Sequence, residues 1–201
     1  MPKVTFYNLT EEKQQKLIGA AQEEFSACPF SNASIANIVK SAGIPRGSFY
    51  QYFEDKEDLY LFLLNGLAEK RKAEFARILQ QNNGELFQSL SEFYISVLQK
   101  VDMPEFTKNI FLNMTEKTEM AFSKIMADKE TGESFEEMKS LVDRTKLNIQ
   151  NDHEFYHLLK ILFAVTMRNW VERFAKDLSW KESAANFELE LKLLKNGLMK
   201  N

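Results

Sequence analysis

Apolar residues recur at helical spacing over most of the 201-residue chain, and no internal repeat or low-complexity tract interrupts them. The first pattern predicts a helix from about Glu11 to Ala27, with Thr10 as its N-cap. Ser34 has a suitable side chain to cap a shorter helix over 35–42. The chain is therefore expected to begin with two helices of unequal length, separated by a break at 28–33.

A third helix is predicted directly after a tight turn. Gly43 ends the preceding helix in the usual C-terminal manner, and Pro45 opens the next one, where its missing N–H is harmless. Phe49 and Phe53 lie four residues apart, so both are expected to anchor this helix to a core. A long fourth helix is predicted over 56–79.

The C-terminal part of the chain carries a second set of helical patterns. The segment 154–176 contains "LLKILFAVTM", which is apolar on almost every side and must be covered all round. The last helix, over about 180–199, has two apolar lines, the second formed by Leu189 and Leu193. Because a monomer's edge needs one such face, we expect self-association through the last two helices, with burial by the chain itself as the alternative. The expected interface residues are Leu162, Val165, Phe187, Leu191, Leu194 and Leu198.

Composition limits the class of protein. Apolar residues make up 44% of the chain and charged residues 27%, enough for one large domain or a small one joined to a larger one. No apolar run is long enough to span a membrane, and the N-terminus lacks the apolar run of a signal peptide. The single cysteine, Cys28, agrees with a reducing environment, so we expect a cytoplasmic protein without a membrane partner. The formal net charge of -3 means that any DNA contact must come from a local surface.

Two short helices joined by a glycine-containing turn describe a helix-turn-helix. The second of them, within "PRGSFYQY", leaves several polar and aromatic side chains to point outward or along the edges: Arg46, Ser48, Tyr50, Gln51 and Tyr52. Arg46 can donate a forked pair of hydrogen bonds to guanine or phosphate, and Gly47 permits close backbone approach. The tyrosine hydroxyls can donate to phosphate oxygens. This helix is therefore expected to meet a groove of duplex DNA.

The stretch "SIANIVKSAGIPRGSFYQYFEDKEDLY" resembles the DNA-binding head of the tetracycline-repressor (TetR/AcrR) family of bacterial regulators. The match covers about 11–63, and its specific part is 42–59. It implies an all-α fold, with a three-helix helix-turn-helix DNA-binding head over 1–55 and a larger effector-binding and dimerisation body over 56–201. The helix over 56–79 would connect the two. The resemblance also implies a homodimeric transcriptional regulator, more often a repressor, on a palindromic operator in double-stranded DNA.

The resemblance further implies roles for single residues. Ser34 would bind phosphate through its hydroxyl, Arg46 would face base edges or nearby phosphates, and Tyr50 would contact the DNA backbone and thymine methyls. Ala36 stands where many members carry a polar residue able to reach a base, so direct readout from the helix over 35–42 is expected to be limited. The implied DNA-binding residues are Ser34, Arg46, Gly47, Ser48, Tyr50, Gln51, Tyr52 and Lys56.

Family members usually bind a small effector between the C-terminal helices, and the resemblance implies the same here. An aromatic and methionine-rich lining suits an apolar or amphipathic molecule, whereas filling of a core is the alternative for each lining residue. Arg168 lies in an apolar helix and is expected to pair with Glu172, with a carboxylate across the dimer, or with an anionic effector. The expected lining residues are Phe106, Phe111, Met114, Phe122, Phe163, Met167, Arg168 and Trp170.

Other functions find less support in the sequence. The chain has no glycine-rich phosphate loop, no Cys/His pair with a basis for activation and no carboxylate pair in a recognisable cleft, so we expect no enzyme. His153 and His157 have a spacing that could hold a metal, but no third ligand is evident, so we expect neither a metal nor a cofactor. The alternative function is an adaptor of the same fold that binds DNA or protein without a small effector.

Overall fold

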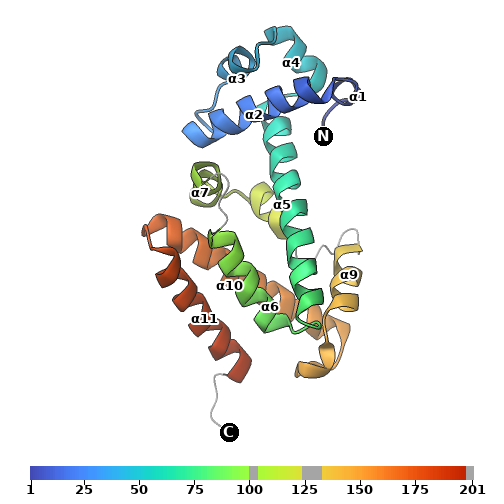
Figure 1. Ribbon diagram of the computed structural model, residues 1–201, viewed down its shortest axis with the longest axis vertical. Helices are drawn as coiled ribbons and strands as arrows, with labels where there is room; N and C mark the ends of the chain where they lie inside the picture. Colours follow the sequence, from blue (N-terminus) through green and yellow to red (C-terminus); the bar gives the residue numbers. More distant parts are fainter. Residues whose placement is uncertain (100–103, 124–132, 198–201) are drawn as a thin grey trace. The chain divides into compact units, whose positions relative to one another are not determined.

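The computed structural model describes residues 1–99, 104–123 and 133–197, and within these ranges it contains helices and turns but no strand (Figure 1). The all-α prediction is therefore confirmed. None of the helices in the described ranges is both long and apolar enough to cross a membrane. Leu198, which the sequence analysis assigns to a subunit interface, lies outside the described residues.

The described residues form two compact units. The first consists of Met1–Leu67 and Asp102–Phe122, and the second of Ala68–Val101 and Ser123–Asn201. The helices of the first unit are α1 (Val4–Tyr7), α2 (Glu11–Ala27), α3 (Ile35–Ala42), α4 (Arg46–Tyr52), the first part of α5 (Lys56–Gln81), α7 (Pro104–Leu112) and α8 (Glu116–Ser123). The second unit holds the rest of α5, then α6 (Leu86–Gln99), α9 (Glu133–Leu141), the short 3₁₀ helix η1 (Arg144–Lys146), α10 (Asp152–Ala175) and α11 (Trp180–Asn196).

Local capping signals set the helix boundaries of the first unit. Ser34 caps α3, its hydroxyl accepting a hydrogen bond from the N–H of Ala36 at 3.2 Å. Gly43 ends α3 in the left-handed region, with φ of 67°. Asp55 precedes α5 and accepts from the N–H of Asp58 at 2.8 Å. The helices expected around residues 11–27, 35–42 and 46–52 are therefore confirmed at their predicted positions.

Aromatic side chains hold the first unit together in two clusters. In one, Phe6 lies 5.1 Å from Phe53 and 5.6 Å from Phe62, measured between ring centroids. In the other, Tyr60 lies 4.9 Å from Phe25 and 6.2 Å from Phe106. The second cluster joins the end of α2, the start of α5 and α7, and offset or edge-on ring pairs of this kind stabilise a core beyond the area that they bury.

The second unit has a core of stacked rings. The Tyr94 ring stacks at 4.0 Å on Phe187 and at 5.8 Å on Trp170, which joins α6, α10 and α11. The buried Tyr94 hydroxyl forms a 2.6 Å hydrogen bond with Ser183, and burial raises the pKa of Tyr94 to about 12. Between α10 and α11, the amide of Asn169 donates to Glu190 at 2.6 Å. The inner face of α11 therefore packs against α6 and α10.

The two apolar lines of α11 have different surroundings. Phe187 and Leu191 are buried in the second unit, as is Leu162 on α10, so these predicted interface side chains pack within their own chain. The second line stays uncovered, since Leu189 is 58% exposed and Leu193 is 47% exposed. The prediction of two apolar faces is confirmed, and three of the residues assigned to a partner, Leu162, Phe187 and Leu191, are the ones buried within the chain. Val165 and Leu194 are half-buried between these extremes.

Candidate DNA-binding surface

Helix α4 presents one face to the core and the opposite face to solvent. Phe49 is fully buried, and so is Phe53 immediately after the helix, which confirms their predicted anchoring role. Their ring centroids lie 5.9 Å apart. The opposite stripe, spaced at i, i+1, i+4 and i+5, is exposed throughout and is called the α4 face below: Arg46, Gly47, Tyr50 and Gln51.

The α4 face combines a charge, an aromatic ring and an amide. Tyr50 is 42% exposed, and its ring stands edge-on to the buried Phe49 at 5.4 Å, which fixes the direction of the side chain. Arg46 has no hydrogen-bond or ion-pair partner among the described residues. Ser48 and Tyr52 flank the face and are half-buried. The residues predicted to meet DNA in this helix are thus brought together, four on the exposed stripe and two at its edges.

Gly47 stands in open space. A Cβ built on it meets no atom within 4 Å, and its backbone is not in the left-handed region. The fold therefore does not require glycine here, and crowding near the helix start, the ordinary structural explanation, does not apply. A missing side chain in the middle of an exposed face lets a partner's backbone approach closely.

The turn between α3 and α4 is fixed by backbone geometry. Gly43 in the left-handed region lets the N–H of Ile44 bond to the carbonyl of Val39 at 3.0 Å. Pro45 then occupies the N-cap position of α4, where it donates no hydrogen bond, and its carbonyl accepts from the N–H of Ser48 at 2.9 Å. Backbone hydrogen bonds therefore hold the turn that joins the two helices.

The start of α3 is held by a carboxylate from α2. Glu24 accepts from the backbone N–H of Ser34 at 2.7 Å and from the side-chain amide of Asn37 at 3.0 Å. Glu24 was not singled out in the sequence, because its partners lie ten or more residues away. Ser34 is half-buried, and its hydroxyl already accepts a hydrogen bond from the N–H of Ala36, so its capping role is confirmed and its contact with phosphate stays a prediction.

Lys56 does not extend freely toward a partner. Its ammonium donates to the carbonyls of Phe30 at 2.7 Å and Ala33 at 2.8 Å, with a third contact to Ser31 at 3.3 Å. It also lies 4.6 Å from the centroid of the Phe30 ring. Because an ammonium has three donors, Lys56 is saturated by the turn over 30–33. In this geometry Lys56 supports the turn that leads into Ser34, whereas the resemblance placed it among the DNA-binding residues.

The N-terminal segment caps the other end of α4. The N–H of Lys3 donates to the carbonyl of Tyr52 at 2.8 Å, and the Lys3 ammonium donates to that of Tyr50 at 2.9 Å. The hydroxyl of Thr5 donates to the carbonyl of Gln51. These are carbonyls of the last turn of α4, which have no partner within the helix. Neither α1 nor this contact was predicted, because no local pattern marks it.

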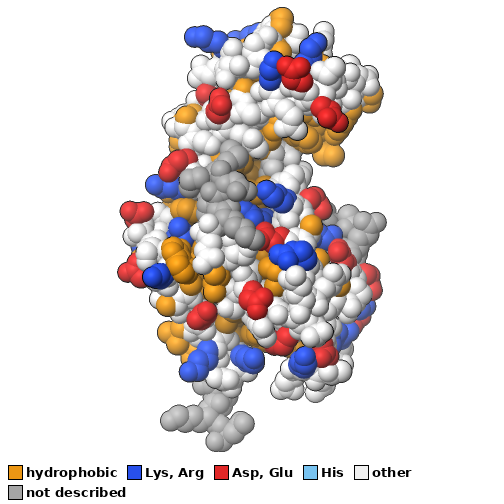
Figure 2. Space-filling model, viewed as in Figure 1, with side chains coloured by type: hydrophobic (Ala, Val, Ile, Leu, Met, Phe, Trp, Pro, Cys, Tyr) orange, Lys and Arg blue, Asp and Glu red, His pale blue; other side chains and the backbone are white. Residues whose placement is uncertain are grey.

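Charge around the surface is mixed. Lysine and arginine side chains lie at the end of the first unit that carries α3 and α4 (Figure 2). The acidic residues after α4 have partners: Asp58 accepts from the N–H of Glu54 at 3.1 Å, and Glu57 pairs with Lys117 at 2.8 Å. Asp55 and Asp58 therefore act as caps, since both accept backbone N–H groups at the start of α5.

The predicted effector residues are divided between the two units. Phe106, Phe111 and Phe122 are buried in the first unit, whereas Met167 and Trp170 are buried in the second. Of the remaining three, Met114 lines a pocket of the first unit, Phe163 is half-buried and Arg168 is exposed. The positive charge of Arg168 helps to lower the pKa of Glu172, after the larger effect of Lys176. This effect agrees with pairing of Arg168 with Glu172, one of the three alternatives that the sequence leaves open.

The histidine pair also lies at the surface. The Nε2 atoms of His153 and His157 are 3.2 Å apart, and both residues are exposed. Across the described ranges, no group of three or more His, Cys, Asp or Glu side chains is placed to hold a metal ion.

Comparison with known families assigns both parts of the chain. A model described as bacterial regulatory proteins of the tetR family matches residues 17–62, which include α3, α4 and the turn between them. A second model, described as the tetracyclin repressor-like C-terminal domain, matches residues 82–198, more than half of the chain.

Relatives and solved structures agree with this assignment. The transcriptional regulator AcuR of Cereibacter sphaeroides is 39% identical over 67 residues, which are 33% of this chain and 29% of AcuR. The alignments with the curated relatives span about a third of those proteins' length.

Two solved structures share the fold along nearly the whole chain. A TetR family regulator from Chloroflexus aurantiacus has a TM-score of 0.52 at 23% identity, covering 98% of both chains. The fatty acid degradation regulator FadR of Bacillus halodurans has a TM-score of 0.60 at 16% identity, covering 96% of this chain and 99% of FadR. The chain belongs to the tetracycline-repressor (TetR) family, whose members are transcriptional regulators and not enzymes.

Proposed function

We propose that this protein is a ligand-responsive, homodimeric repressor that binds a palindromic operator through the α4 face and is released by a small apolar or amphipathic effector. Members of the family typically bind operator DNA and are typically dimeric. The observation that carries the proposal is the division of α4 into a buried anchor, Phe49, and an exposed stripe with Arg46 and Tyr50. A helix held in this way offers side chains to a major groove without loosening its own core.

The α4 face supplies the chemistry that a groove requires. Arg46 has a free guanidinium that can donate two parallel hydrogen bonds to a guanine or a phosphate. Tyr50 presents both an apolar ring, suited to a thymine methyl, and a hydroxyl donor for phosphate oxygens. Gly47 leaves room for the DNA backbone between them. Lys56 and Lys3 act behind this face, by holding the segments at the two ends of the helix-turn-helix.

The second unit supports the dimeric part of the proposal. Ile161 on α10 is 49% exposed, and Leu189 and Leu193 on α11 are exposed as well; these three aliphatic side chains are called the aliphatic face below. Hydrophobic side chains gather over α11 in Figure 2. Because an exposed aliphatic cluster of this kind favours burial against a second copy, we place the subunit interface on this face. Two copies would bring two α4 helices to half-sites about 34 Å apart.

Salt-dependent binding to DNA tests this proposal. Labelled fragments from upstream of the protein's own gene and shuffled fragments of equal length are titrated by fluorescence anisotropy, at about 50 mM and about 200 mM salt. We expect at least one upstream fragment to bind about a thousandfold more tightly than its shuffled form. Equal affinity for both, or no retention at the lower salt, would contradict operator binding. Native mass spectrometry of freshly purified protein then distinguishes an effector-binding repressor from an adaptor, because a bound effector adds mass.

A further inference from the structure

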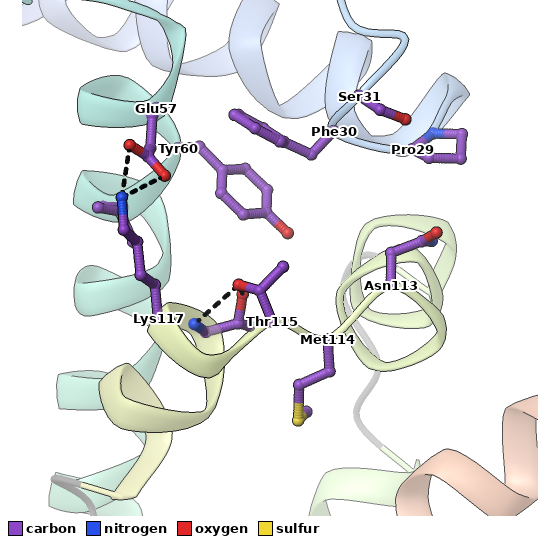
Figure 3. Close-up of a pocket in the computed structure, with 11 residues that line it drawn as sticks. Pro29, Phe30, Ser31, Glu57, Tyr60, Asn113, Met114, Thr115 and Lys117 are labelled. Atoms are coloured by element: carbon purple, nitrogen blue, oxygen red, sulfur yellow. Dashed lines mark hydrogen bonds and ion pairs between the residues drawn. The ribbon is translucent and has the colours of Figure 1, made fainter.

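A pocket of about 330 Å³ lies within the first unit, beside the helix-turn-helix. The turn over 29–31 after α2 forms one side, the first two turns of α5 form the second, and the connection between α7 and α8 forms the third (Figure 3). Its size is at the lower end of the range for small-molecule sites. Phe30, Tyr60 and Met114 provide an aromatic and sulfur-bearing interior.

The hydroxyl of Tyr60 is a donor without a partner in the described structure. Tyr60 is 8% exposed, and Figure 3 shows its hydroxyl directed into the space between Asn113 and Met114. None of the described residues forms a hydrogen bond with it. Burial raises the pKa of Tyr60 to about 12, so the hydroxyl keeps its proton at neutral pH. Other polar groups nearby are engaged: the amide of Asn113 donates to the carbonyl of Asn109 at 3.0 Å, and the hydroxyls of Thr115 and Thr118 bond at 2.9 Å.

Charge and shape restrict the ligand. Glu57 and Lys117 pair at 2.8 Å at the edge of the pocket, so their charges cancel and an ionic ligand gains little. The rings of Phe30 and Tyr60, 4.8 Å apart, form a wall against which a flat ring packs. We propose that this pocket binds a small uncharged aromatic molecule with a carbonyl-type acceptor for the Tyr60 hydroxyl, and that binding is coupled to the DNA-binding surface.

The coupling follows from residues shared by the pocket and the turn before α3. Phe30 and Ser31 line the pocket, and their carbonyls also hold the Lys56 ammonium. A ligand seated against the Phe30 ring shifts the same turn that precedes Ser34, the N-cap of α3. Occupancy therefore changes how α3 is held relative to α5. This step depends on the proposed function, whereas the binding of a ligand to the pocket does not.

Binding is tested on the full chain with three related probes. Acetophenone carries the acceptor, ethylbenzene replaces its carbonyl by a methylene, and benzoate adds a charge. Two-dimensional amide NMR locates each probe, and titration gives its affinity. We expect shifts at 29–31 and 113–118, with acetophenone binding about fivefold more tightly than ethylbenzene, the effect of one hydrogen bond. Benzoate is expected to bind more weakly than acetophenone.

Two variants make the assignment specific. Tyr60→Phe keeps the ring and removes the hydroxyl, so the affinity for acetophenone should fall to that for ethylbenzene. The midpoint of thermal unfolding should stay unchanged. Met114→Trp fills the space opposite Tyr60 and should abolish binding of both probes. The site would be overturned if Tyr60→Phe kept the original protein's preference for acetophenone over ethylbenzene. It would also be overturned if the NMR shifts were confined to other parts of the chain, or if no probe bound.

The coupling is tested separately with the upstream fragment that the anisotropy titration selects. Saturating acetophenone should weaken DNA binding by about tenfold in the original protein. It should not change the DNA affinity of Met114→Trp. DNA binding that stays constant while the pocket is occupied would overturn the coupling. If no DNA is bound even without probe, the proposed function fails, and the NMR experiment still decides whether the pocket takes an aromatic carbonyl ligand.

Discussion

In the part of the chain that the structure describes, each unit has an exposed helical face that is a candidate for a partner, and the two faces differ in chemistry. The α4 face carries Arg46, Tyr50 and Gln51 around an open glycine, whereas the aliphatic face carries Ile161, Leu189 and Leu193. Protein–DNA interfaces are polar and positively charged, and homodimer interfaces are the more apolar class. Exposure alone therefore does not identify a partner. The kind of side chain left exposed on a well-anchored helix does.

Substitutions in the aliphatic face should have the larger effect of the two, because they should weaken the proposed dimer. Leu189→Glu combined with Leu193→Glu would place two carboxylates in the proposed interface, at a cost of at least about 4 kcal/mol, or a thousandfold in dimer dissociation. Both side chains are largely exposed in the monomer, so the fold should persist. Analytical ultracentrifugation measures the dissociation, and circular dichroism measures the thermal unfolding.

A matched control adds the same charge elsewhere in the second unit. Gln80→Glu combined with Gln81→Glu, at exposed positions near the end of α5, should leave the dimer intact. A stable dimer in the leucine variant would remove the aliphatic face from the interface. Loss of the dimer in both variants would indicate a general effect of charge.

The α4 face should respond to loss of its aromatic ring. Tyr50→Ala removes contacts with the DNA backbone and bases, and we expect operator affinity to fall by about 1.5–3 kcal/mol, roughly tenfold to a hundredfold. Thermal stability and dimerisation should change little, because the ring is partly exposed. The control is Tyr7→Ala, at an exposed tyrosine on α1 outside the α4 face. If Tyr50→Ala unfolds the protein, or binds the operator as well as Tyr7→Ala does, the assignment of this face is wrong.

Gly47 allows a finer test of the same face. The Cβ added by Gly47→Ala would have no atom within 4 Å. The free protein should therefore keep its stability or gain up to about 1 kcal/mol. If the DNA backbone approaches at this point, the added methyl group should lower operator affinity by about tenfold, or roughly 1.4 kcal/mol. Gly66→Ala on α5 also meets no atom within 4 Å and serves as the control. Equal DNA binding by the two variants would mean that the approach at Gly47 is not close.

Much of the first unit could be predicted because its signals are local. Ser34 and Gly43 delimit α3 through their own side chain and backbone freedom, and the four-residue spacing of Phe49 and Phe53 identifies the buried side of α4. These interactions join residues within one or two turns. Tyr50 follows Phe49 and is therefore turned by about 100° from it around the helix, which agrees with its exposure.

What could not be predicted depends on contacts between distant residues. The sequence shows two apolar lines on α11, but packing on Tyr94 and Trp170 decides that the line through Phe187 faces inward. In the same way, the sequence predicts Lys56 as a surface charge, whereas in the structure its ammonium donates hydrogen bonds to carbonyls of the turn over 30–33. The N-terminal contact with α4 has no sequence signal of its own, because it joins residues more than forty positions apart.

The smallest expected effect concerns that N-terminal contact and the end of the α4 face that it supports. Thr5→Val keeps the shape of the side chain and removes the hydroxyl that donates to the carbonyl of Gln51. The lost hydrogen bond should cost about 1 kcal/mol, seen as faster hydrogen exchange in the last turn of α4 and a severalfold loss of operator affinity. Thr10→Val is the matched control, because the Thr10 side chain makes no capping bond in the described structure. If the two variants behave alike, α4 is held by its aromatic anchors alone, and the α4 face needs no support from the N-terminal segment.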